Sequence, residues 1–402
     1  MIVGAGLAGA KAAETLREEG FPGRVVLLGA EDELPYERPP LSKQYLIGSA
    51  AREEAYVHPR AFYADNEIEL LTGVAATAID VAEHRLALAD GRDLSYDRLL
   101  IATGAVPRRP PIDGIDLDGV HTLRTLADSE AIQRAAERQG TVAVIGAGWI
   151  GCEVAAAART LGAEVVLLQR GETPLHAVLG PELGAWFAEL HRAHGVRVVT
   201  GARVERIEGD GRVRAVRLAD GDRVECDTVV VGVGVAPDTR LAAAAGLAVD
   251  DGLTVDEHLQ TSRPGIFAAG DVANAFHPHY GRHVRVEHWA TALHQGPAAA
   301  RAMLGTGEAY DRLPYFFSDQ YDVGMEYVGL HDAHDRLVLR GSLAEQAFHA
   351  FWLDADNRVT AGMHVNQWDT IEAVEGLIRA GTPVEPERLE DSTVALDGVH
   401  VK

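Results

Sequence analysis

The chain has 402 residues, a length that predicts two to three domains because single hydrophobic cores stop growing at roughly 250–300 residues. Its hydrophobic content of 47% and charged content of 24% are ordinary for a globular protein. No apolar run approaches the ~20 residues that a membrane-spanning helix needs. The net charge of −23 argues against nucleic acid or an anionic membrane as a partner.

The two cysteines, Cys152 and Cys226, exclude a disulfide framework and fit a reducing compartment. Because Met1 to Val3 run directly into Gly4, we expect no secretory leader before the first glycine turn. We therefore expect a cytoplasmic location. The first strand is shorter than usual, which leaves open a native start upstream of Met1.

The first predicted elements form a strand–turn–helix–strand unit. A short strand over residues 1–3 leads into the fingerprint Gly4-Ala5-Gly6-Leu7-Ala8-Gly9, a helix over residues 8–19 and a buried strand over residues 24–28. The first glycine permits the tight turn, the second lets the backbone approach a pyrophosphate, and the third lets the helix pack on the strand. The phosphates would lie at the positive N-terminus of the helix. This unit predicts a dinucleotide site on a parallel sheet.

The same order recurs in the middle of the chain. A strand over residues 141–145 precedes the fingerprint Gly146-Ala147-Gly148-Trp149-Ile150-Gly151, followed by a helix over residues 151–161 and a strand over residues 164–168. Two fingerprints predict two dinucleotides, and hence electrons passing between them.

A second internal repeat shows that more than the glycine loop is duplicated. The segments 88–107 and 218–237 correspond at a constant offset of 130 residues (218 − 88 and 237 − 107). Each reads as a β-meander with an Asp-Gly turn, followed by a buried strand that ends at a glycine. We therefore predict that the whole nucleotide-binding unit is duplicated.

The remaining elements complete a two-part α/β body and a separate C-terminal part. The Pro-rich segment 107–111 is a stiff linker, a strand over residues 265–271 ends in Gly-Asp, and residues 291–303 read as a helix. From about Asp311 the pattern changes to alternating segments that contain aromatic residues, such as 348–353. This pattern predicts an antiparallel sheet with one or two helices.

Over essentially its whole length, the chain resembles the FAD-dependent NAD(P)H:ferredoxin reductases that serve Rieske oxygenases and cytochromes P450, a family that includes putidaredoxin reductase. Apoptosis-inducing factor shares the architecture. The residues that carry the resemblance are Glu37-Arg38-Pro39-Pro40-Leu41-Ser42-Lys43, Ala102-Thr103-Gly104, Ala268-Ala269-Gly270-Asp271-Val272, Glu287-His288-Trp289 and Ser318-Asp319-Gln320-Tyr321.

The resemblance implies an α/β fold with two Rossmann-like dinucleotide-binding domains of the glutathione reductase type plus an α+β C-terminal domain. Residues 1–112 and 236–311 would form the FAD-binding domain. Residues 113–235 would form the NAD(P)H-binding domain, and residues 312–402 the C-terminal domain.

The resemblance also implies which residues hold FAD. Glu31 would bind a ribose, or else be a solvated loop acid. Asp271 would reach the ribityl–phosphate region, Arg38 and Arg124 the phosphate or the flavin edge unless they are surface charges, and Trp289 the flavin pyrimidine unless it packs in the core. The full expected set is Gly4, Gly6, Leu7, Ala8, Gly9, Glu31, Arg38, Lys43, Ala76, Ala102, Thr103, Gly104, Arg124, Gly270, Asp271, His288 and Trp289.

Lys43 and Glu153 are the expected catalytic pair. We expect Ser42-Lys43 to open a helix after two prolines, and Glu153 to lie on the first turn of the helix that follows the second fingerprint. In similar reductases this pair lies beside the reactive flavin nitrogen, where a buried cation would stabilise negative charge on the flavin and the carboxylate would compensate the cation. The alternative is an interdomain salt bridge without a catalytic part.

The second fingerprint would hold the nicotinamide coenzyme. NADH sites usually carry an acidic residue after the second strand, to bind the ribose 2′-hydroxyl, whereas this chain has Gln169-Arg170. Loss of the carboxylate removes the repulsion of a 2′-phosphate, and Arg170 could bind that phosphate. We therefore expect NAD(P)H, with a lean toward accepting NADPH. The full expected set is Gly146, Gly148, Ile150, Gly151, Gln169, Arg170, Gly232 and Gly234.

Several other chemistries are not expected. Disulfide reductases need a cysteine pair or one reactive cysteine, but the chain has no Cys-x-x-Cys, and we expect Cys152 to be a packing residue. His277, His279 and His283 read as a surface loop and not as a metal site. Phe317 stands where many relatives have tryptophan, which weakens any electron path through this position.

The predicted activity is electron transfer from NAD(P)H through FAD to a [2Fe–2S] ferredoxin that feeds a P450 or Rieske oxygenase. The alternatives are an NAD(P)H oxidase or a monodehydroascorbate-like small-molecule reductase, and a cofactor-switched interaction module like apoptosis-inducing factor. Such ferredoxins are usually acidic, so docking on this acidic chain would need a local basic patch. Candidates for that patch are Arg38, Arg60, Arg301 and Arg312.

Overall fold

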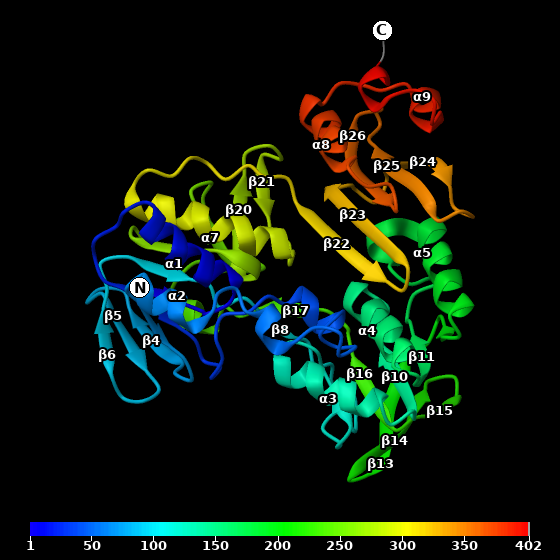
Figure 1. Ribbon diagram of the computed structural model, residues 1–402, viewed down its shortest axis with the longest axis horizontal. Helices are drawn as coiled ribbons and strands as arrows, with labels where there is room; N and C mark the ends of the chain where they lie inside the picture. Colours follow the sequence, from blue (N-terminus) through cyan, green and yellow to red (C-terminus); the bar gives the residue numbers. More distant parts are fainter. Residues whose placement is uncertain (401–402) are drawn as a thin grey trace. The chain divides into compact units, whose positions relative to one another are not determined.

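The computed structural model describes residues 1–400 and divides by its contacts into two compact units (Figure 1). Unit 1 comprises residues 1–37, 52–106 and 236–315. Unit 2 comprises residues 38–51, 107–235 and the described chain from Phe316 on. Two short strands, β8 (Ala105–Pro107) and β17 (Val235–Pro237), contain points where the chain passes from one unit to the other.

Unit 1 is built on a parallel sheet of five strands in the order β19-β7-β1-β2-β3. The strands are β1 (Ile2–Val3), β2 (Val25–Leu28), β3 (Ile68–Leu71), β7 (Leu99–Ile101) and β19 (Ile266–Ala268). Two helices, α1 (Leu7–Glu18) and α7 (Trp289–Leu304), lie side by side (Figure 1). A Cβ on Gly296 would lie 2.3 Å from the carbonyl oxygen of Ala8, so only glycine permits this close approach of the helices.

Two small sheets and several short helices complete unit 1. The β-meander consists of β4 (Ala76–Asp80), β5 (Arg85–Leu88) and β6 (Asp93–Ser95), and the second sheet of β18 (Leu253–Val255), β20 (Ala273–His277) and β21 (Arg282–Val284). The helices are α2 (Arg60–Asp65) and α6 (Arg240–Ala244), with 3₁₀ turns η2 (Arg52–Ala55) and η3 (Gly270–Val272).

Unit 2 contains a second parallel sheet of the same design, in the order β12-β11-β10-β16-β9. Its strands are β9 (Val120–His121), β10 (Thr141–Ile145), β11 (Glu164–Leu168), β12 (Arg197–Val199) and β16 (Thr228–Val231). The helices are α3 (Leu126–Ala136), α4 (Trp149–Thr160) and α5 (His176–Ala193), preceded in the chain by the 3₁₀ turn η1 (Pro39–Ser42). The matching order of strands confirms the predicted duplication.

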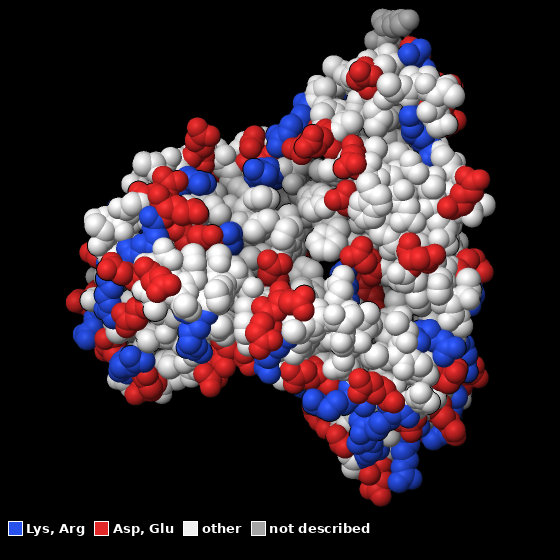
Figure 2. All heavy atoms as spheres, viewed as in Figure 1, with Lys and Arg blue, Asp and Glu red and all other residues white. Residues whose placement is uncertain are grey.

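The second β-meander consists of β13 (Val204–Asp210), β14 (Arg212–Leu218) and β15 (Arg223–Glu225). Figure 2 shows acidic and basic side chains crowded over these strands. Glu208 accepts hydrogen bonds from Arg223, Arg217 and Arg206, which lower the pKa of its carboxyl to about 2. These three arginines of the meander are therefore paired locally with one carboxylate.

The C-terminal part of unit 2 is a five-stranded sheet in the order β22-β23-β26-β25-β24. Its strands are β22 (Tyr315–Gln320), β23 (Val323–Gly329), β24 (Arg336–Ser342), β25 (Ala347–Leu353) and β26 (Val359–Val365), followed by α8 (Ile371–Ala380), α9 (Pro386–Glu390) and η4 (Leu396–Gly398). Met325 and Phe348 share a buried core with Phe187 of α5, while Val374 of α8 lies against Gly362. The sheet thus packs between α5 and α8. The alternating pattern from about Asp311 predicted the antiparallel sheet and its helices, but not the core that it shares with α5.

Most predicted strands and helices agree with the structure to within two residues, and the α/β fold is confirmed. The strand predicted over residues 265–271 is shorter, since β19 ends at Ala268 and η3 follows it. Three local expectations are wrong. Ser42-Lys43 do not open a helix, because the two prolines start η1, which ends at Ser42, and Lys43 has non-helical φ −126° and ψ −119°. Glu153 lies in the second turn of α4, since the helix begins two residues earlier than predicted. His277 ends β20 and is buried, so the expected surface loop is wrong for this residue, whereas His279 and His283 are exposed in the same hairpin.

None of the helices in residues 1–400 combines the length and the apolar character that crossing a bilayer requires.

Candidate functional site

In unit 1, the first fingerprint forms a cradle of backbone at the start of α1. Gly4 has φ +117°, and a Cβ there would lie 2.1 Å from the carbonyl oxygen of Ala102. A Cβ on Gly9 would lie 2.0 Å from the carbonyl oxygen of Gly4. Gly6, by contrast, has no protein atom within 4 Å of the Cβ position. Two glycines are thus required by packing, and the middle one leaves open space where a phosphate can approach.

In unit 2, the second fingerprint repeats this geometry. Gly146 has φ +101°, and a Cβ there would lie 2.4 Å from the carbonyl oxygen of Gly232. A Cβ on Gly151 would lie 1.9 Å from the carbonyl oxygen of Gly146, whereas Gly148 again faces open space. Neither α1 nor α4 has a side-chain cap or an acidic residue in its first turn. Both helix N-termini therefore present uncapped amides, which suits a pyrophosphate.

Other expected FAD residues gather around the first fingerprint within unit 1. A Cβ on Gly29 would lie 2.7 Å from Cβ of Ala5, so the end of β2 adjoins the glycine turn. Glu31 follows, and its Oε2 accepts a hydrogen bond of 2.6 Å from the hydroxyl of Tyr36. Gly270 has φ +78° and adjoins Ala8 of α1. These positions fit a dinucleotide that runs from the glycine turn toward the end of β2.

The later parts of unit 1 hold the remaining expected residues. Thr103 follows β7 and donates a 2.8 Å hydrogen bond to the carbonyl of Asp238, and Asp271 lies in η3 directly after β19. His288 precedes α7, and burial lowers its pKa to about 4. Trp289 begins α7, and its Nε1 donates to Glu37 at 3.0 Å. The expected residues Ala102, Gly104 and Ala76 lie at the end of β7 and the start of β4.

The expected coenzyme residues surround the second fingerprint within unit 2. Gln169 follows β11; its Oε1 accepts from the amide of Ala147 at 3.2 Å and its Nε2 donates to the carbonyl of Thr173 at 3.2 Å. Arg170 is exposed, and no side chain in residues 1–400 pairs with it. Its guanidinium is therefore available to an anionic ligand, while the amide of Gln169 is engaged by the protein.

Two apolar side chains near this fingerprint are exposed. Ile150 of α4 is 47% exposed, and Val233, which lies between the expected residues Gly232 and Gly234, is 37% exposed. A Cβ on Gly232 would lie 3.5 Å from Cα of Gly151, so this second glycine pair adjoins the fingerprint. Exposed apolar side chains around an open glycine turn are typical of a ligand site. The sequence prediction missed Val233, although its position in a Gly-x-Gly segment could have indicated it.

The expected catalytic pair forms a buried ion pair in unit 2. Lys43 Nζ lies 2.8 Å from Glu153 Oε2, and the two side chains are only 7% and 3% exposed. Ser42 donates to the same carboxylate oxygen at 2.5 Å, and Ser318 of β22 donates to Oε1 at 2.7 Å. The carboxylate thus has three donors, which compensates the cost of burying its charge. Neither serine was predicted, although Ser318 belongs to the quoted Ser-Asp-Gln-Tyr motif.

Two side chains of β22 influence the ammonium of Lys43. Its Nζ lies 5.3 Å from the ring centroid of Phe317, close enough for a cation–π interaction. The pKa of Asp319 is raised, chiefly by burial, while Lys43 lowers it and Glu153 raises it again. An aromatic ring and two carboxyl groups therefore surround a lysine that is nearly inaccessible to water.

The expected FAD residues are divided between the two units. Arg38 donates to the backbone carbonyl of Arg124, and both residues belong, with Lys43, to unit 2. Arg124 directly precedes the N-cap Thr125 of α3, whose capping box with Asp128 fixes the helix start. The other expected FAD residues lie in unit 1.

Both cysteines lie in the core. Cys152 and Cys226 are free and buried, and burial raises the pKa of both thiols, that of Cys226 to about 12. A thiol that does not ionise near neutral pH is a poor nucleophile, so the structure speaks against thiol–disulfide chemistry. In residues 1–400, no three His, Cys, Asp or Glu side chains are grouped as metal ligands.

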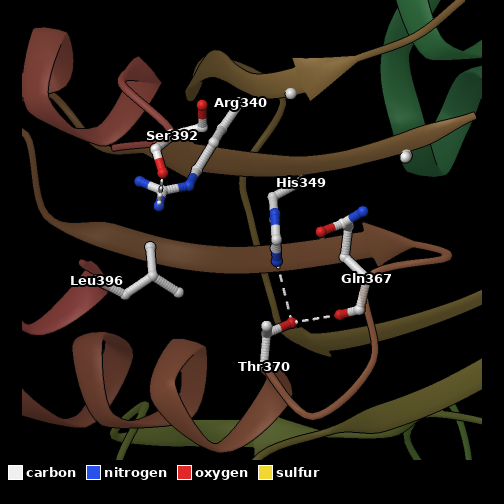
Figure 3. A pocket seen from close by; sticks show the side chains of 8 residues that line it. Arg340, His349, Gln367, Thr370, Ser392 and Leu396 are labelled. Carbon is white, nitrogen blue, oxygen red and sulfur yellow. Dashed lines mark hydrogen bonds between the residues drawn. The ribbon is translucent and has the colours of Figure 1, made fainter. Parts of the chain in front are cut away.

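A separate cavity of about 240 Å³ lies in the C-terminal part of unit 2 (Figure 3). Figure 3 shows His349 pointing toward Thr370, to which it is hydrogen-bonded at 3.0 Å, and Arg340 beside Ser392. Arg340 also donates to the backbone carbonyls of Asp391 and Val394. None of the expected site residues lines this cavity, and its principal polar groups already bond to the protein. We therefore assign it no part in the reaction.

Comparisons with known proteins agree with this geometry. The family model described as pyridine nucleotide-disulphide oxidoreductase matches residues 1–296, and the model described as reductase C-terminal matches residues 315–399. Putidaredoxin reductase CamA of Pseudomonas putida is 40% identical, with 98% of this chain and 95% of that protein covered. The ferredoxin–NAD(+) reductase component of the anthranilate 1,2-dioxygenase system of Burkholderia cepacia is 41% identical, with 98% of each chain covered.

A solved structure with the same fold is the crystal structure of the covalent putidaredoxin reductase–putidaredoxin complex. It matches with a TM-score of 0.95 and 40% identity, covering 98% of this chain and 96% of that chain. Proteins of this family use FAD and NAD(P)H, and both glycine cradles fit such cofactors. The chain therefore belongs to the pyridine nucleotide-disulphide oxidoreductases and, among them, to the FAD-dependent reductases that include the ferredoxin reductase components of oxygenase systems.

Proposed function

We propose that this protein passes electrons from NAD(P)H through FAD to a [2Fe–2S] ferredoxin, which in turn supplies a P450 or Rieske oxygenase. The observation that carries the proposal is the buried Lys43–Glu153 pair in a chain with two complete glycine cradles and no available thiol. The relatives named above are reductases of putidaredoxin and of a dioxygenase system, which supports the same partner class.

The side chains of this protein would bind and orient the reactants. Bound FAD supplies the conversion of a two-electron hydride transfer into single-electron steps. The two glycine cradles would hold the pyrophosphates. As the resemblance implies, the ammonium of Lys43, which Glu153 fixes, would provide a positive charge near the reacting end of the flavin. Glu153 holds that ammonium in place and helps to orient the nicotinamide. The expected site residues remain proposals in these roles.

We further propose that each part of the chain has the binding role that the resemblance implies. Residues 1–112 and 236–311 would bind FAD, residues 113–235 NAD(P)H, and residues 312–402 would form the C-terminal domain. The two buried, unpaired cysteines support a reducing, cytoplasmic location.

The test is reduction of cytochrome c by NAD(P)H with and without purified [2Fe–2S] ferredoxins. We expect a rate that depends on the ferredoxin and saturates with it. Lys43→Ala should slow it roughly tenfold or more, because the buried positive charge is lost. Lys11→Ala is the matched control, since Lys11 is a lysine of α1 paired with Glu14 and outside the expected site.

Rapid NAD(P)H consumption without any carrier would contradict the proposal and favour an oxidase or a small-molecule reductase. Binding of a partner that depends on the cofactor, without turnover, would favour an interaction module. Salt dependence of the ferredoxin rate adds a further check. Of the candidate docking arginines, Arg301 is paired with Glu19 at 2.7 Å, whereas Arg60 and Arg312 are exposed.

A further inference from the structure

Behind the Lys43–Glu153 pair, unit 2 contains a continuous run of buried hydrogen bonds. Ser318, which donates to Glu153, accepts a 3.2 Å hydrogen bond from Nε2 of Gln320. Oε1 of Gln320 lies 3.0 Å from Nε2 of His191 in α5, and Nδ1 of His191 lies 3.0 Å from the hydroxyl of Tyr321. Ser318, Gln320 and His191 are all buried. We call Ser318, Gln320, His191 and Tyr321 the support chain.

The hydrogen bonds of the support chain all run in one direction. Oε1 of Gln320 can only accept, so Nε2 of His191 carries the proton and donates. Burial lowers the pKa of His191 to about 4, so the ring is neutral and its Nδ1 accepts from the hydroxyl of Tyr321. Each donor therefore points toward Glu153, and the aligned dipoles favour negative charge at the end of the chain.

We propose that the residues of the support chain are positioning residues for Glu153, which hold its carboxylate fixed against Lys43. The inference rests on the proposed function only in giving the Lys43–Glu153 pair its part in NAD(P)H-dependent reduction. It adds to that function one residue of α5 and three residues from β22 and the position after it, none of which belongs to a glycine fingerprint or to the lysine motif.

The chemistry of the links favours positioning over proton conduction. The amide of Gln320 holds its protons and offers no ready relay between Ser318 and His191. Removing one link would leave a buried donor or acceptor unpaired and would weaken the hydrogen bond that reaches the carboxylate. The support chain therefore transmits orientation and charge stabilisation, not protons.

The titratable groups around the support chain are few and belong to several elements. Lys43 and Asp319 face Glu153, from the segment after η1 and from β22. At the other end, His194, directly after α5, stacks on Tyr321 with ring centroids 3.7 Å apart, and its Nε2 lies 3.8 Å from Asp322. The charge of Arg159 in α4 also acts on Tyr321. Cys152, beside Glu153 on α4, has a raised pKa because it is buried, so it stays neutral.

The experiment compares variants that break the support chain with one that preserves it. Gln320→Leu and His191→Leu interrupt the chain, Tyr321→Phe removes its first donor, and His191→Gln keeps one donor and one acceptor without a titratable ring. The control is Trp186→Phe, which removes the 3.0 Å hydrogen bond from α5 to the carbonyl of Leu343 but lies outside the chain.

We expect the two leucine variants to slow flavin reduction by NAD(P)H about tenfold, the rate equivalent of one hydrogen bond to a charged group. Tyr321→Phe should slow it less, and His191→Gln and Trp186→Phe should stay within about twofold of the parent. The effect should fall on the rate constant at saturating coenzyme and not on KM, because the chain does not reach the coenzyme cradle. Flavin reduction without ferredoxin is measured by anaerobic stopped flow.

Two spectroscopic measurements test the inference independently of activity. Nitrogen-15 NMR of histidine-labelled protein should show His191 as the Nε2–H tautomer near neutral pH. Infrared difference spectra against Glu153→Gln should assign a carboxylate band that shifts in Gln320→Leu but not in Trp186→Phe.

A His191 that carries its proton on Nδ1, or leucine variants with the parent's rate and carboxylate band, would overturn the inference. Loss of activity in His191→Gln equal to that in His191→Leu would also overturn it, since it would point to a titrating relay. If ferredoxins are not reduced but the variants behave as expected, the proposed electron acceptor fails and the inference stands. If a leucine variant does not fold, Tyr321→Phe and the tautomer of parent His191 still decide.

Discussion

Gln169 and Arg170 are the side chains on which coenzyme choice depends. The side-chain amide of Gln169 accepts a hydrogen bond from Ala147 in the glycine turn and donates one to the carbonyl of Thr173, so it is used to hold the loop. Arg170 is exposed beside it. A ribose 2′-phosphate would therefore meet the guanidinium of Arg170 and an amide, not a carboxylate, at position 169, which suits NADPH.

We predict that Arg170→Ala lowers kcat/KM for NADPH about tenfold and changes that for NADH little, because only the phosphate loses its partner. Gln169→Glu should shift the preference toward NADH, since the carboxylate keeps the acceptor for Ala147 and repels a phosphate. Steady-state kinetics with both coenzymes measure this. A parent preference for NADH above tenfold would contradict the prediction.

At the residue scale, the sequence indicated the ion pair of the site but not the buried residues that support it. Lys43 and Glu153 were expected as a pair from the resemblance, and the structure joins them in one ion pair, although their role stays a prediction. His191 gave no signal, because a lone histidine in a helix is usually a core or surface residue. Its partners lie about 130 positions away in the chain, a separation at which no local pattern reports contact.

The strand–turn–helix element depends on two kinds of glycine that the motif does not distinguish. Gly151 packs against the backbone of Gly146, whereas Gly148 faces open space and has φ −78°, which any residue can adopt. Gly151 is therefore required by the packing of the fold, whereas Gly148 leaves space for the ligand.

We predict that Gly151→Ala destabilises the protein by about 1–3 kcal/mol, because its Cβ cannot fit and overpacking outweighs the gain in helix propensity. Gly148→Ala should leave thermal unfolding without ligand unchanged but weaken NAD(P)H binding, since the added methyl group occupies the phosphate approach. Thermal unfolding and coenzyme titration separate the two effects. Equal loss of stability in both variants would contradict this reading of the turn.

At the element scale, the buried parallel strands were predictable because continuous apolar runs end at glycines. The predicted bounds of β10 and β11 agree with the structure. The conformation of the segment around Ser42 was not predictable, since a proline pair can start either a helix or a short 3₁₀ turn. Here the non-helical backbone of Lys43 ends a short 3₁₀ turn. The histidine hairpin was missed because His277 is buried among partners that its local sequence does not reveal.

For the whole molecule, buried histidines predict sensitivity to acid. Burial lowers the pKa values of His191, His288 and His349 to about 4, from the ordinary 6.5. Between these pH values the unfolded chain binds more protons than the folded one, so stability is full above about pH 6.5 and falls as the pH is lowered toward 4.

We predict that each of these histidines contributes up to about 3 kcal/mol to this loss. Urea unfolding at pH 7 and pH 4.5 should show a clear drop for the parent and a smaller drop for His191→Gln, which keeps the hydrogen bonds but cannot titrate. Equal drops in both proteins would show that His191 takes no part in the acid sensitivity.

The overall architecture was predictable because the duplication is visible as a constant offset and each copy has the same order of strands. What the sequence did not reveal is how contacts divide the chain. Residues 38–51 and the C-terminal sheet belong to unit 2 with the second nucleotide-binding sheet, and the former through buried side chains such as Leu46. Such grouping depends on packing between segments far apart in sequence.

The origin of the edge strands sets an order in which the molecule can be assembled on the ribosome. In unit 2 the edge strand β9 comes before the other four strands of its parallel sheet in the chain. This sheet is therefore complete once residue 231, the end of β16, has been made. In unit 1 the corresponding edge strand, β19, comes after both nucleotide-binding repeats in the chain. The first sheet therefore lacks this strand until residue 268 has been made. The half that is synthesised first is therefore completed last, and the emerging chain cannot complete its first parallel sheet until about two thirds of its length has been made.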